Sequence, residues 1–331
     1  MKKMINQAEN IVSEMLQGML KAYPNMLQQV ADLPIIVRKQ KKQQRVGLVS
    51  GGGSGHEPAH AGFVGYGMLD AAVAGEVFTS PSADKVYEAI KAVDSGKGVL
   101  LIIKNYSGDV MNFEMAAEMA AMEGITVSKI IVDDDIAVEN STYTVGRRGI
   151  AGTVLVHKMV GAAAESGYSL EALEQFGNKV IANTKTIGMA LKPCLVPTTG
   201  KLSFELADDE VEIGLGIHGE PGTHREKIQS ADQHVDHLLE KLLAESNLSA
   251  EDEVAVLVNG LGETTLIELF IINNRVADVL QSKNIRVVDT LVGNYMTSLD
   301  MGGFSITLSK LDSEMKQMLQ AKADTVAFKR G

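Results

Sequence analysis

The stretch LVSGGGSGHEP, residues 48–58, places four glycines and a serine directly after a short apolar run. His56, Glu57 and Pro58 follow the glycines. A glycine-rich turn at the end of a strand permits positive φ and lets backbone N–H groups approach a small, oxygen-rich ligand. These residues therefore predict a ligand-binding turn in an α/β protein. A tight strand-to-helix turn with a surface histidine is the alternative interpretation.

The glycine turn does not match either common nucleotide-binding motif. A Walker A loop requires lysine after its last glycine, and Gly55 is followed by His56. The dinucleotide fingerprint requires a third glycine, but a motif beginning at Gly51 or Gly53 meets His56 or Pro58 at that position. We therefore expect no nucleotide at this turn.

On both sides of the turn, short apolar runs alternate with helical patterns. Strands are expected at 34–37, 45–50, 98–106 and 125–135, and helices at 7–22, 82–93, 112–123 and 149–166. The run VLLII, residues 99–103, is apolar on both faces, as in a central parallel strand. This alternation predicts βαβ units in a doubly wound N-terminal sheet, with ligands beyond the carboxyl ends of its strands.

The stretch 186–201 contains two prolines and no helical period, so we predict a domain boundary near its start. Beyond it, strands are expected at 211–217, 253–258, 286–292 and 304–311, and helices at 229–246 and 263–282. The predicted fold is α/β with two domains, each a β-sheet flanked by helices. They span 1–185, with the glycine turn, and 186–331.

Composition narrows the class of protein. The 331 residues are 45% hydrophobic and carry a net charge of -11. No basic block interleaved with aromatic residues is present, so nucleic acid is not expected as a partner. No apolar run reaches the roughly 18 residues of a membrane span, and we expect a cytoplasmic protein without membrane contact. The single cysteine, Cys194, is expected to fill the core.

Two histidines occupy similar turns. His218, in GLGIHGEPG (214–222), follows an expected strand and, like His56, is followed by Glu and Pro. A strand-end histidine is often structural, but two such turns indicate a shared function.

Further polar residues follow other expected strands. In IIKNYSGD (102–109), Asp109 suits a general base near Lys104, although a surface turn explains it almost as well. GEVFTSPSADK (75–85) supplies Thr79 and Ser80, with Ser82 as a helix N-cap.

Three other clusters of charged or polar residues are assigned structural roles or left without a role. The carboxylates of VDDDI (132–136) are expected in capping and turn roles rather than at a metal. His234 and His237 are expected on a solvated helix face. Arg147 and Arg148 could meet an anionic partner or lie near a helix start, and the sequence does not choose between these roles.

Long motifs place the chain near a known family. They are SGGGSGHEP, GEVFTSPSADK, LLIIKNYSGDVMNFE, YTVGRRGIAGTVLVHKMVGAAAE, GIHGEPG, LVNGLG and MTSLDMGGFSITL. In order and spacing the sequence resembles the dihydroxyacetone-binding subunit of dihydroxyacetone (glycerone) kinases, nearly from end to end.

The resemblance implies roles for the residues singled out above. His218 matches the histidine whose imidazole adds to the ketone of dihydroxyacetone as a hemiaminal. Asp109 matches the base that takes a proton from the terminal hydroxyl, and His56 matches a residue that hydrogen-bonds the substrate and assists proton transfer. Gly53, Ser80 and Lys104 match positions that line the pocket.

The resemblance also implies partners, since the chain itself shows no cofactor-binding motif. ADP or ATP with Mg²⁺ is expected on a separate nucleotide-bearing subunit, which donates phosphate and is recharged from phosphoenolpyruvate through a phosphohistidine protein of the phosphotransferase system. A homodimer is expected. One alternative is a non-catalytic dihydroxyacetone sensor that coactivates a transcription regulator. Another is a stand-alone ATP-dependent sugar kinase, which predicts ATP binding by this chain alone.

Overall fold

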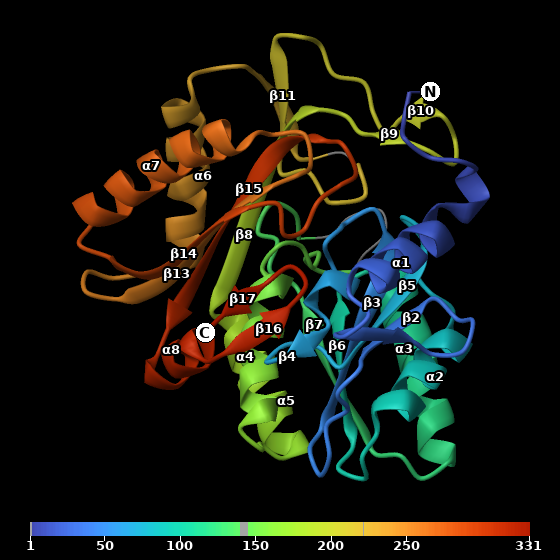
Figure 1. Cartoon of the computed structure of the whole chain (residues 1–331). Coiled ribbons are helices and arrows are strands. Elements are labelled where there is room, and N and C mark those ends of the chain that lie inside the picture. The colour runs from blue at the N-terminus through green and yellow to red at the C-terminus, as the bar shows by residue number, and fades with distance from the viewer. Residues whose placement is uncertain (1, 140–144, 221) are drawn as a thin grey trace.

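The computed structural model describes residues 2–139, 145–220 and 222–331. Two six-stranded sheets dominate it, and helices flank each of them (Figure 1). The α/β prediction with two sheets is confirmed. No helix in the described part of the chain is long and apolar enough to cross a membrane.

The first sheet has the order β1-β2-β5-β3-β6-β7. Its central strands β5, β3, β6 and β7 are parallel, and β1 and β2 add an antiparallel edge. The strands are β1 (Leu27–Gln29), β2 (Ile35–Arg38), β3 (Gly47–Ser54), β5 (Ala71–Val77), β6 (Val99–Lys104) and β7 (Val127–Val132).

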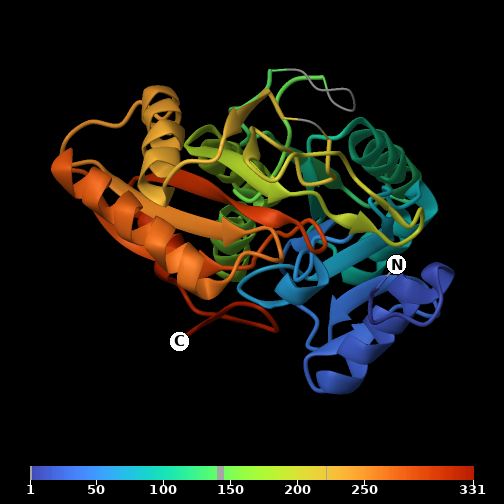
Figure 2. The same ribbon diagram turned by 90° about the horizontal axis from the view of Figure 1, so that it is seen from above.

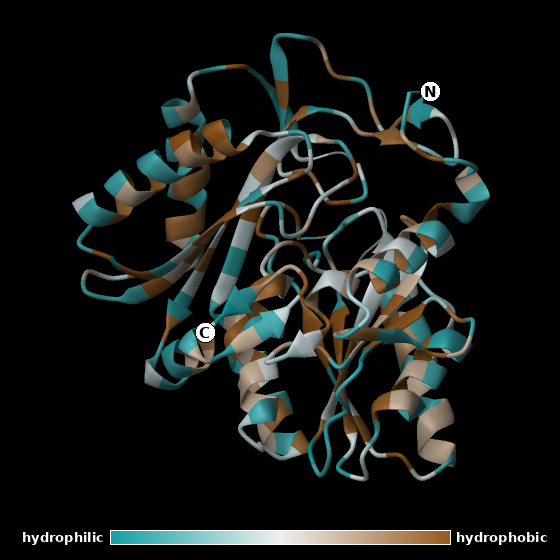
Figure 3. Cartoon of the chain, viewed as in Figure 1, coloured by the Kyte–Doolittle hydropathy of each residue, from teal (hydrophilic) through white to brown (hydrophobic). Residues whose placement is uncertain are grey.

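Helices cover both faces of this sheet, so it is doubly wound as predicted. The helices are α1 (Ile11–Ala22), α2 (Ala83–Val93), α3 (Ser107–Met122), α4 (Thr153–Glu165) and α5 (Leu170–Ala182). In β6, Leu101 and Ile103 pack with residues of α2 and α3, whereas Leu100 and Ile102 pack with residues of α1, α4 and α5. This alternation explains why the run at 99–103 is apolar throughout. Figure 3 shows apolar colour on the strands of this sheet.

The second sheet has the order β12-β11-β8-β15-β13-β14 and is antiparallel except between β13 and β14. Its strands are β8 (Thr184–Lys192), β11 (Glu210–Ile213), β12 (His224–Lys227), β13 (Glu253–Gly260), β14 (Arg286–Gly293) and β15 (Gly302–Leu311). The helices α6 (Ala231–Glu245) and α7 (Leu266–Ser282) lie on its outer side, away from α1 (Figure 2). Its inner face shares a core with the first half.

Shorter elements complete the fold. They are η1 (Ala8–Asn10), η2 (Ala61–Phe63), β4 (Gly65–Tyr66), β9 (Leu195–Val196), β10 (Lys201–Leu202), α8 (Ser313–Gln320), β16 (Ala323–Thr325) and β17 (Lys329–Arg330). Near the end of the chain, β16 pairs with β4 of the first half. The expected division after residue 185 falls inside β8, and it stays a prediction.

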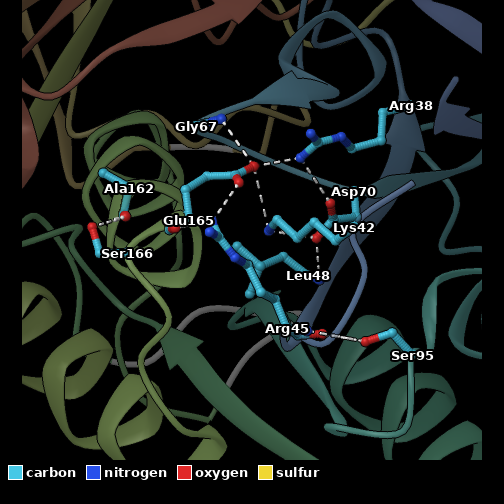
Figure 4. Close-up of polar contacts among 10 residues, drawn as sticks. All are labelled: Arg38, Lys42, Arg45, Leu48, Gly67, Asp70, Ser95, Ala162, Glu165 and Ser166. Carbon is cyan, nitrogen blue, oxygen red and sulfur yellow. Dashed lines mark hydrogen bonds and ion pairs between the residues drawn. The ribbon is translucent and has the colours of Figure 1, made fainter. Parts of the chain in front are cut away.

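A buried ion-pair network holds the C-terminal end of α4 against the first sheet (Figure 4). Glu165, the last residue of α4, pairs with Arg38, Arg45 and Lys42. Asp70 accepts hydrogen bonds from Arg38 at 3.2 Å and Lys42 at 2.8 Å. Because a carboxylate is unfavourable at a helix C-terminus, these cations compensate Glu165 where α4 ends.

Several boundaries differ from those expected. The strand expected at 45–50 is β3, which runs on to Ser54, so Gly51, Gly52 and Gly53 lie at the end of the strand and not in a turn after it. The helix expected at 112–123 is α3, which begins five residues earlier, at Ser107. The strand expected at 211–217 ends at Ile213, so His218 lies in the following loop. The stretch from 186 was expected to lack regular structure, but β8 runs to Lys192 because its two prolines, Pro193 and Pro197, come only after the strand.

Candidate active site

A pocket of about 480 Å³ opens beyond the carboxyl ends of β3, β5 and β6, where the sequence predicts ligand binding. The loop after β11 closes it from the second half of the chain. Its lining residues are Gly53, Phe78, Ser80, Tyr106, Ser107, Gly108, Asp109 and His218. The structure therefore brings four of the six predicted site residues, Gly53, Ser80, Asp109 and His218, to one pocket.

Close packing requires glycine both at position 53, near the end of β3, and at position 55, just after it. A Cβ atom on Gly53 would lie 2.6 Å from the backbone nitrogen of Thr79. At Gly55, φ is 108° and a Cβ atom would lie 2.8 Å from the ring of Phe78. Any side chain at either position would push the turn away from the segment after β5, which forms the opposite wall of the pocket.

His56 is fully buried and held in one tautomer. Its Nδ1 lies 2.8 Å from the carbonyl oxygen of Thr297, which can only accept, so Nδ1 carries the proton. Its Nε2 has no hydrogen-bond partner among the described residues. Burial, followed by the charges of Lys104 and His218, holds the pKa of His56 well below its usual value. His56 is therefore a neutral ring whose free lone pair is on Nε2.

The His218 ring stands among three other rings. Its centroid lies 4.4 Å from that of Tyr106, 4.8 Å from that of His56 and 5.6 Å from that of Phe78, all in edge-to-face arrangement. Its side chain keeps 16% exposure and lines the pocket. This aromatic surround fixes the ring plane while leaving one edge open to a ligand.

Asp109 lies in the first turn of α3, not in the loop expected from the sequence. Its carboxyl is buried, and burial raises its pKa, although Lys104, a hydrogen bond with Ser80 and His218 oppose that rise. Oδ1 has no hydrogen-bond partner among the described residues. A buried carboxylate with a raised pKa and a free oxygen is suited to accept a proton.

Lys104 ends β6 behind Asp109 and does not line the pocket. A Cβ atom on Gly52 would lie 3.2 Å from its Nζ and 3.5 Å from Oδ2 of Asp109, so glycine at position 52 leaves room for both. Burial lowers the pKa of Lys104, against the charges of Asp109 and Glu220. Lys104 acts as a buried positive charge beside the carboxylate.

Several residues of the site were not singled out from the sequence. Phe78 lines the pocket, Thr297 holds His56, and Glu220 accepts a hydrogen bond from the backbone nitrogen of His218 at 2.9 Å. Glu220 had a signal, the repeated His–Glu–Pro order. Thr297 had none, because it comes from a segment remote in sequence.

The capping and turn roles expected for the carboxylates of 132–136 and the core position of Cys194 are confirmed. Asp134 accepts hydrogen bonds from the backbone nitrogens of Ile150 and Gly152, and Asp135 accepts one from that of Ala137. Cys194 is buried. In residues 2–139, 145–220 and 222–331, no group of three His, Cys, Asp or Glu side chains could hold a metal ion.

The solvated interpretation of His234 is wrong. His234 is buried, and its Nε2 accepts a hydrogen bond from the backbone nitrogen of Gln229 at 2.9 Å. The buried face of α6 therefore includes His234 as well as the leucines. His237 is half-buried, with Nδ1 3.4 Å from Glu226. Of the two arginines whose role was left open, Arg147 pairs with Glu245, and Arg148 is buried against Asp135.

Comparison with known proteins shows the family of this chain over almost its whole length. Residues 17–327 match the family model described as the Dak1 domain. The chain is 55% identical over 329 residues to the dihydroxyacetone-binding subunit of PTS-dependent dihydroxyacetone kinase 1 of Listeria innocua, covering 99% of this chain and 100% of that one. It is 56% identical over 312 residues to the corresponding subunit of Lactococcus lactis, covering 94% of each.

Solved structures are also similar. The dihydroxyacetone kinase operon co-activator Dha-DhaQ superposes with a TM-score of 0.91 at 41% identity, over 96% of this chain and 98% of that one. The dihydroxyacetone kinase of C. freundii superposes with a TM-score of 0.90 at 39% identity. That match covers 99% of this chain and 60% of the longer one.

Proposed function

The chain belongs to the Dak1 family, and from this premise we propose that it is the dihydroxyacetone-binding subunit of a dihydroxyacetone kinase. The observation that carries the proposal is the meeting of His218 and Asp109 in one pocket, with neutral His56 against the His218 ring. Relatives of similar length bear the same name, and the alignment covers both chains almost completely.

Dihydroxyacetone is held covalently on His218. The lone pair of a ring nitrogen attacks the ketone carbon, a C–N bond forms, and the carbonyl π electrons move to oxygen, which takes up a proton. Glycerol offers no carbonyl carbon to attack, so formation of the bond itself selects the ketone over the polyol. The edge-on packing of Tyr106 and Phe78 against the His218 ring supports this role, because it limits rotation of the nucleophile.

Asp109 is the general base. As the terminal hydroxyl attacks phosphorus, the O–P bond forms, the hydroxyl proton moves to the Asp109 carboxylate, and the donor's phosphate bond breaks. His56 offers Nε2 as an acceptor for a substrate hydroxyl and assists the proton transfer. Gly53 and Ser80 shape the wall, and Lys104 contributes its charge from behind Asp109.

The phosphoryl donor is a separate nucleotide-bearing subunit, with ADP or ATP and Mg²⁺ bound there. We propose that it is recharged from phosphoenolpyruvate through a phosphohistidine protein; similar subunits named PTS-dependent and PEP-dependent support this proposal. The glycine turn of this chain supports the division of labour, since His56 stands where a nucleotide loop requires lysine. We also propose a homodimer.

Turnover with a purified donor subunit tests the proposal. The chain, a nucleotide-bearing subunit and a phosphoenolpyruvate-driven recharging system should convert dihydroxyacetone to its phosphate, and omission of any component should stop the reaction. This chain with ATP alone should give no product. Product formation from ATP without a donor subunit would instead support the stand-alone kinase.

A second candidate is a dihydroxyacetone-sensing coactivator of a transcription regulator. The structural similarity to the operon co-activator favours it, because its TM-score is nearly equal to that of the C. freundii kinase. A sensor needs His218 but not the base Asp109. Dihydroxyacetone binding without any turnover, in the presence of a competent donor subunit, would favour the sensor.

A further inference from the structure

We propose that Glu220 and Arg148 form a positioning pair that orients His218, with Nδ1–H facing Glu220 and the lone pair of Nε2 facing the ligand. This inference rests on the proposed function of His218 as a nucleophile. The family resemblance stated above assigns no role to Glu220 or Arg148, and the two residues come from opposite halves of the chain.

Glu220 holds both the backbone and the ring of His218. One carboxylate oxygen, Oε2, accepts a hydrogen bond from the backbone nitrogen of His218 at 2.9 Å. The other, Oε1, lies 3.8 Å from Nδ1 of the ring and has no hydrogen-bond partner among the described residues. A carboxylate facing Nδ1 favours the tautomer with the proton there, which leaves the lone pair on Nε2.

Arg148 fixes Glu220 in turn. Its guanidinium has 0% exposure and lies with Nη1 3.6 Å from Oε1 of Glu220. Nε donates to Asp135 at 2.7 Å, and Nη2 donates to the carbonyl oxygen of Gly214 at 2.7 Å. A guanidinium anchored at two other points carries its remaining Nη1 in a fixed direction, toward Glu220.

The loop that carries His218 is built around this pair. A Cβ atom on Gly216 would lie 2.2 Å from Oε1 of Glu220 and 2.6 Å from Nη1 of Arg148. Only glycine leaves room for the two charged groups at this point of the loop. Gly216 therefore leaves the space in which the positioning pair meets.

Electrostatics keep Glu220 charged. Although burial alone would raise it, the pKa of Glu220 is lowered to about 2 by its interactions with His218 and Arg148. Glu220 is therefore anionic across the range in which enzymes work. The other titratable or charged groups near His218 and Glu220 are His56, Lys104, Tyr106, Asp109, Asp134 and Asp135.

The pair also stabilises the product of the addition. When Nε2 bonds to the ketone carbon, the ring keeps its Nδ1 proton and the new alkoxide takes one proton from water. The adduct ring then carries one positive charge, which the negative charge of Glu220 balances. Glu220 should therefore favour the adduct as well as orient the free ring.

The decisive variant is Glu220→Gln, with Glu220→Asp as the conservative variant and Glu226→Gln as the matched control. Glu226 also pairs with a histidine, His224, at 2.7 Å, but on the surface strand β12. We expect Glu220→Gln to weaken dihydroxyacetone adduct formation roughly 10- to 100-fold, by analogy with the carboxylates that orient metal-binding histidines. The pH above which the adduct is lost should move to a lower value. Glu220→Asp should restore part of both effects. Wild-type adduct levels and an unchanged pH profile in folded Glu220→Gln would overturn the proposal.

A second measurement needs no variant at position 220. In the ¹⁵N-histidine NMR spectrum of the unmodified protein, assigned with His218→Ala, the ligand-free His218 ring should show the proton on Nδ1. A proton on Nε2 would overturn the proposal even if Glu220→Gln fails to fold. If the unmodified protein forms no adduct at all, the proposed function fails, and the tautomer still tests the positioning pair independently.

Discussion

Asp109 combines two features that a base needs, burial with a raised pKa and an oxygen free of hydrogen bonds. Replacing Asp109 with Asn should leave dihydroxyacetone binding in place and lower turnover by about 10²-fold or more, because the hydroxyl proton loses its acceptor. Since a base must be deprotonated, turnover of the unmodified protein should fall as pH drops through the raised pKa of Asp109.

The measurement is steady-state turnover with the donor subunit, paired with adduct detection on the same preparations. Ser80→Ala, which removes the hydrogen bond to Asp109 but keeps the carboxylate, is the control and should keep most of the activity. Near-normal turnover in Asp109→Asn would remove Asp109 from the mechanism.

At Gly53, the end of β3 comes close to the segment after β5 that forms the opposite wall of the pocket. Gly53→Ala places a methyl group 2.6 Å from the backbone nitrogen of Thr79, so the turn must move and dihydroxyacetone affinity should fall. Titration calorimetry measures the change. Gly18→Ala is the matched control, because a Cβ atom there meets nothing within 4 Å, and it should leave affinity unaltered. Unchanged affinity in both variants would contradict the close-approach role of the turn.

At the residue scale, local motifs identify most of the pocket residues. They do not identify residues whose role depends on a partner that is distant in the sequence. Gly53, Ser80 and Asp109 lie at or just after the carboxyl ends of β3, β5 and β6, which are neighbours in one sheet, so order along the chain is sufficient to group them. His218 follows β11 of the other sheet, and strand order alone does not bring it to them. Arg148 could not be assigned, because its partner Glu220 is remote in sequence. Sequence gave no sign that Lys104 lies behind the pocket rather than in its wall.

At the scale of elements, α4 and α8 meet through a buried amine. Lys158 of α4 donates to the carbonyl oxygen of Met318, near the end of α8, at 2.7 Å. Burial, followed by the charge of Arg330, lowers the pKa of Lys158 to about 8. The unfolded chain therefore binds more protons than the folded one between pH 8 and about 10.4, and stability contributed by this group rises with pH across that window.

Comparison with Lys158→Met isolates this contribution. The difference in free energy of unfolding, unmodified protein minus variant, should increase by roughly 3 kcal/mol from pH 8 to pH 10.4. Denaturant unfolding at several pH values measures it. A flat difference for Lys158→Met would mean that its amine titrates normally.

Helices and strands were predicted correctly where the hydrophobic pattern was strong. They were missed or misplaced where small residues or flanking prolines obscured that pattern. The run at 99–103 gave β6, with Leu100 and Leu101 on opposite faces, because burial on both sides leaves a continuous apolar signal. β5, with the sequence AAVAGEV, was not expected, since alanines give little periodicity. The start of α3 was placed too late, because Gly108 and Asp109 are typical of turns.

At the scale of the whole molecule, one core crosses the two halves. In β13, Val254, Val256 and Val258 pack toward α6 and α7. The alternate residues Ala255 and Leu257 join the core that also contains Leu100 of β6. The halves therefore share buried surface as well as a pocket, and we expect them to unfold together.

Differential scanning calorimetry tests this cooperativity. The unmodified chain should give one transition, with equal calorimetric and van't Hoff enthalpies. Phe328→Ala, at a buried side chain that ties the end of the chain into the shared core, should lower the free energy of unfolding by about 3–5 kcal/mol without splitting the transition. Two separate transitions would mean that the halves are independent domains.

The central claim is a covalent bond between dihydroxyacetone and His218, and NMR with dihydroxyacetone labelled with ¹³C at the carbonyl tests it most directly. The account predicts that the bound carbon gives a tetrahedral rather than a ketone signal. That signal should be absent with His218→Ala and should persist with Asp109→Asn. A bound ligand whose carbon keeps its ketone signal, or a tetrahedral signal that survives in His218→Ala, would contradict the account.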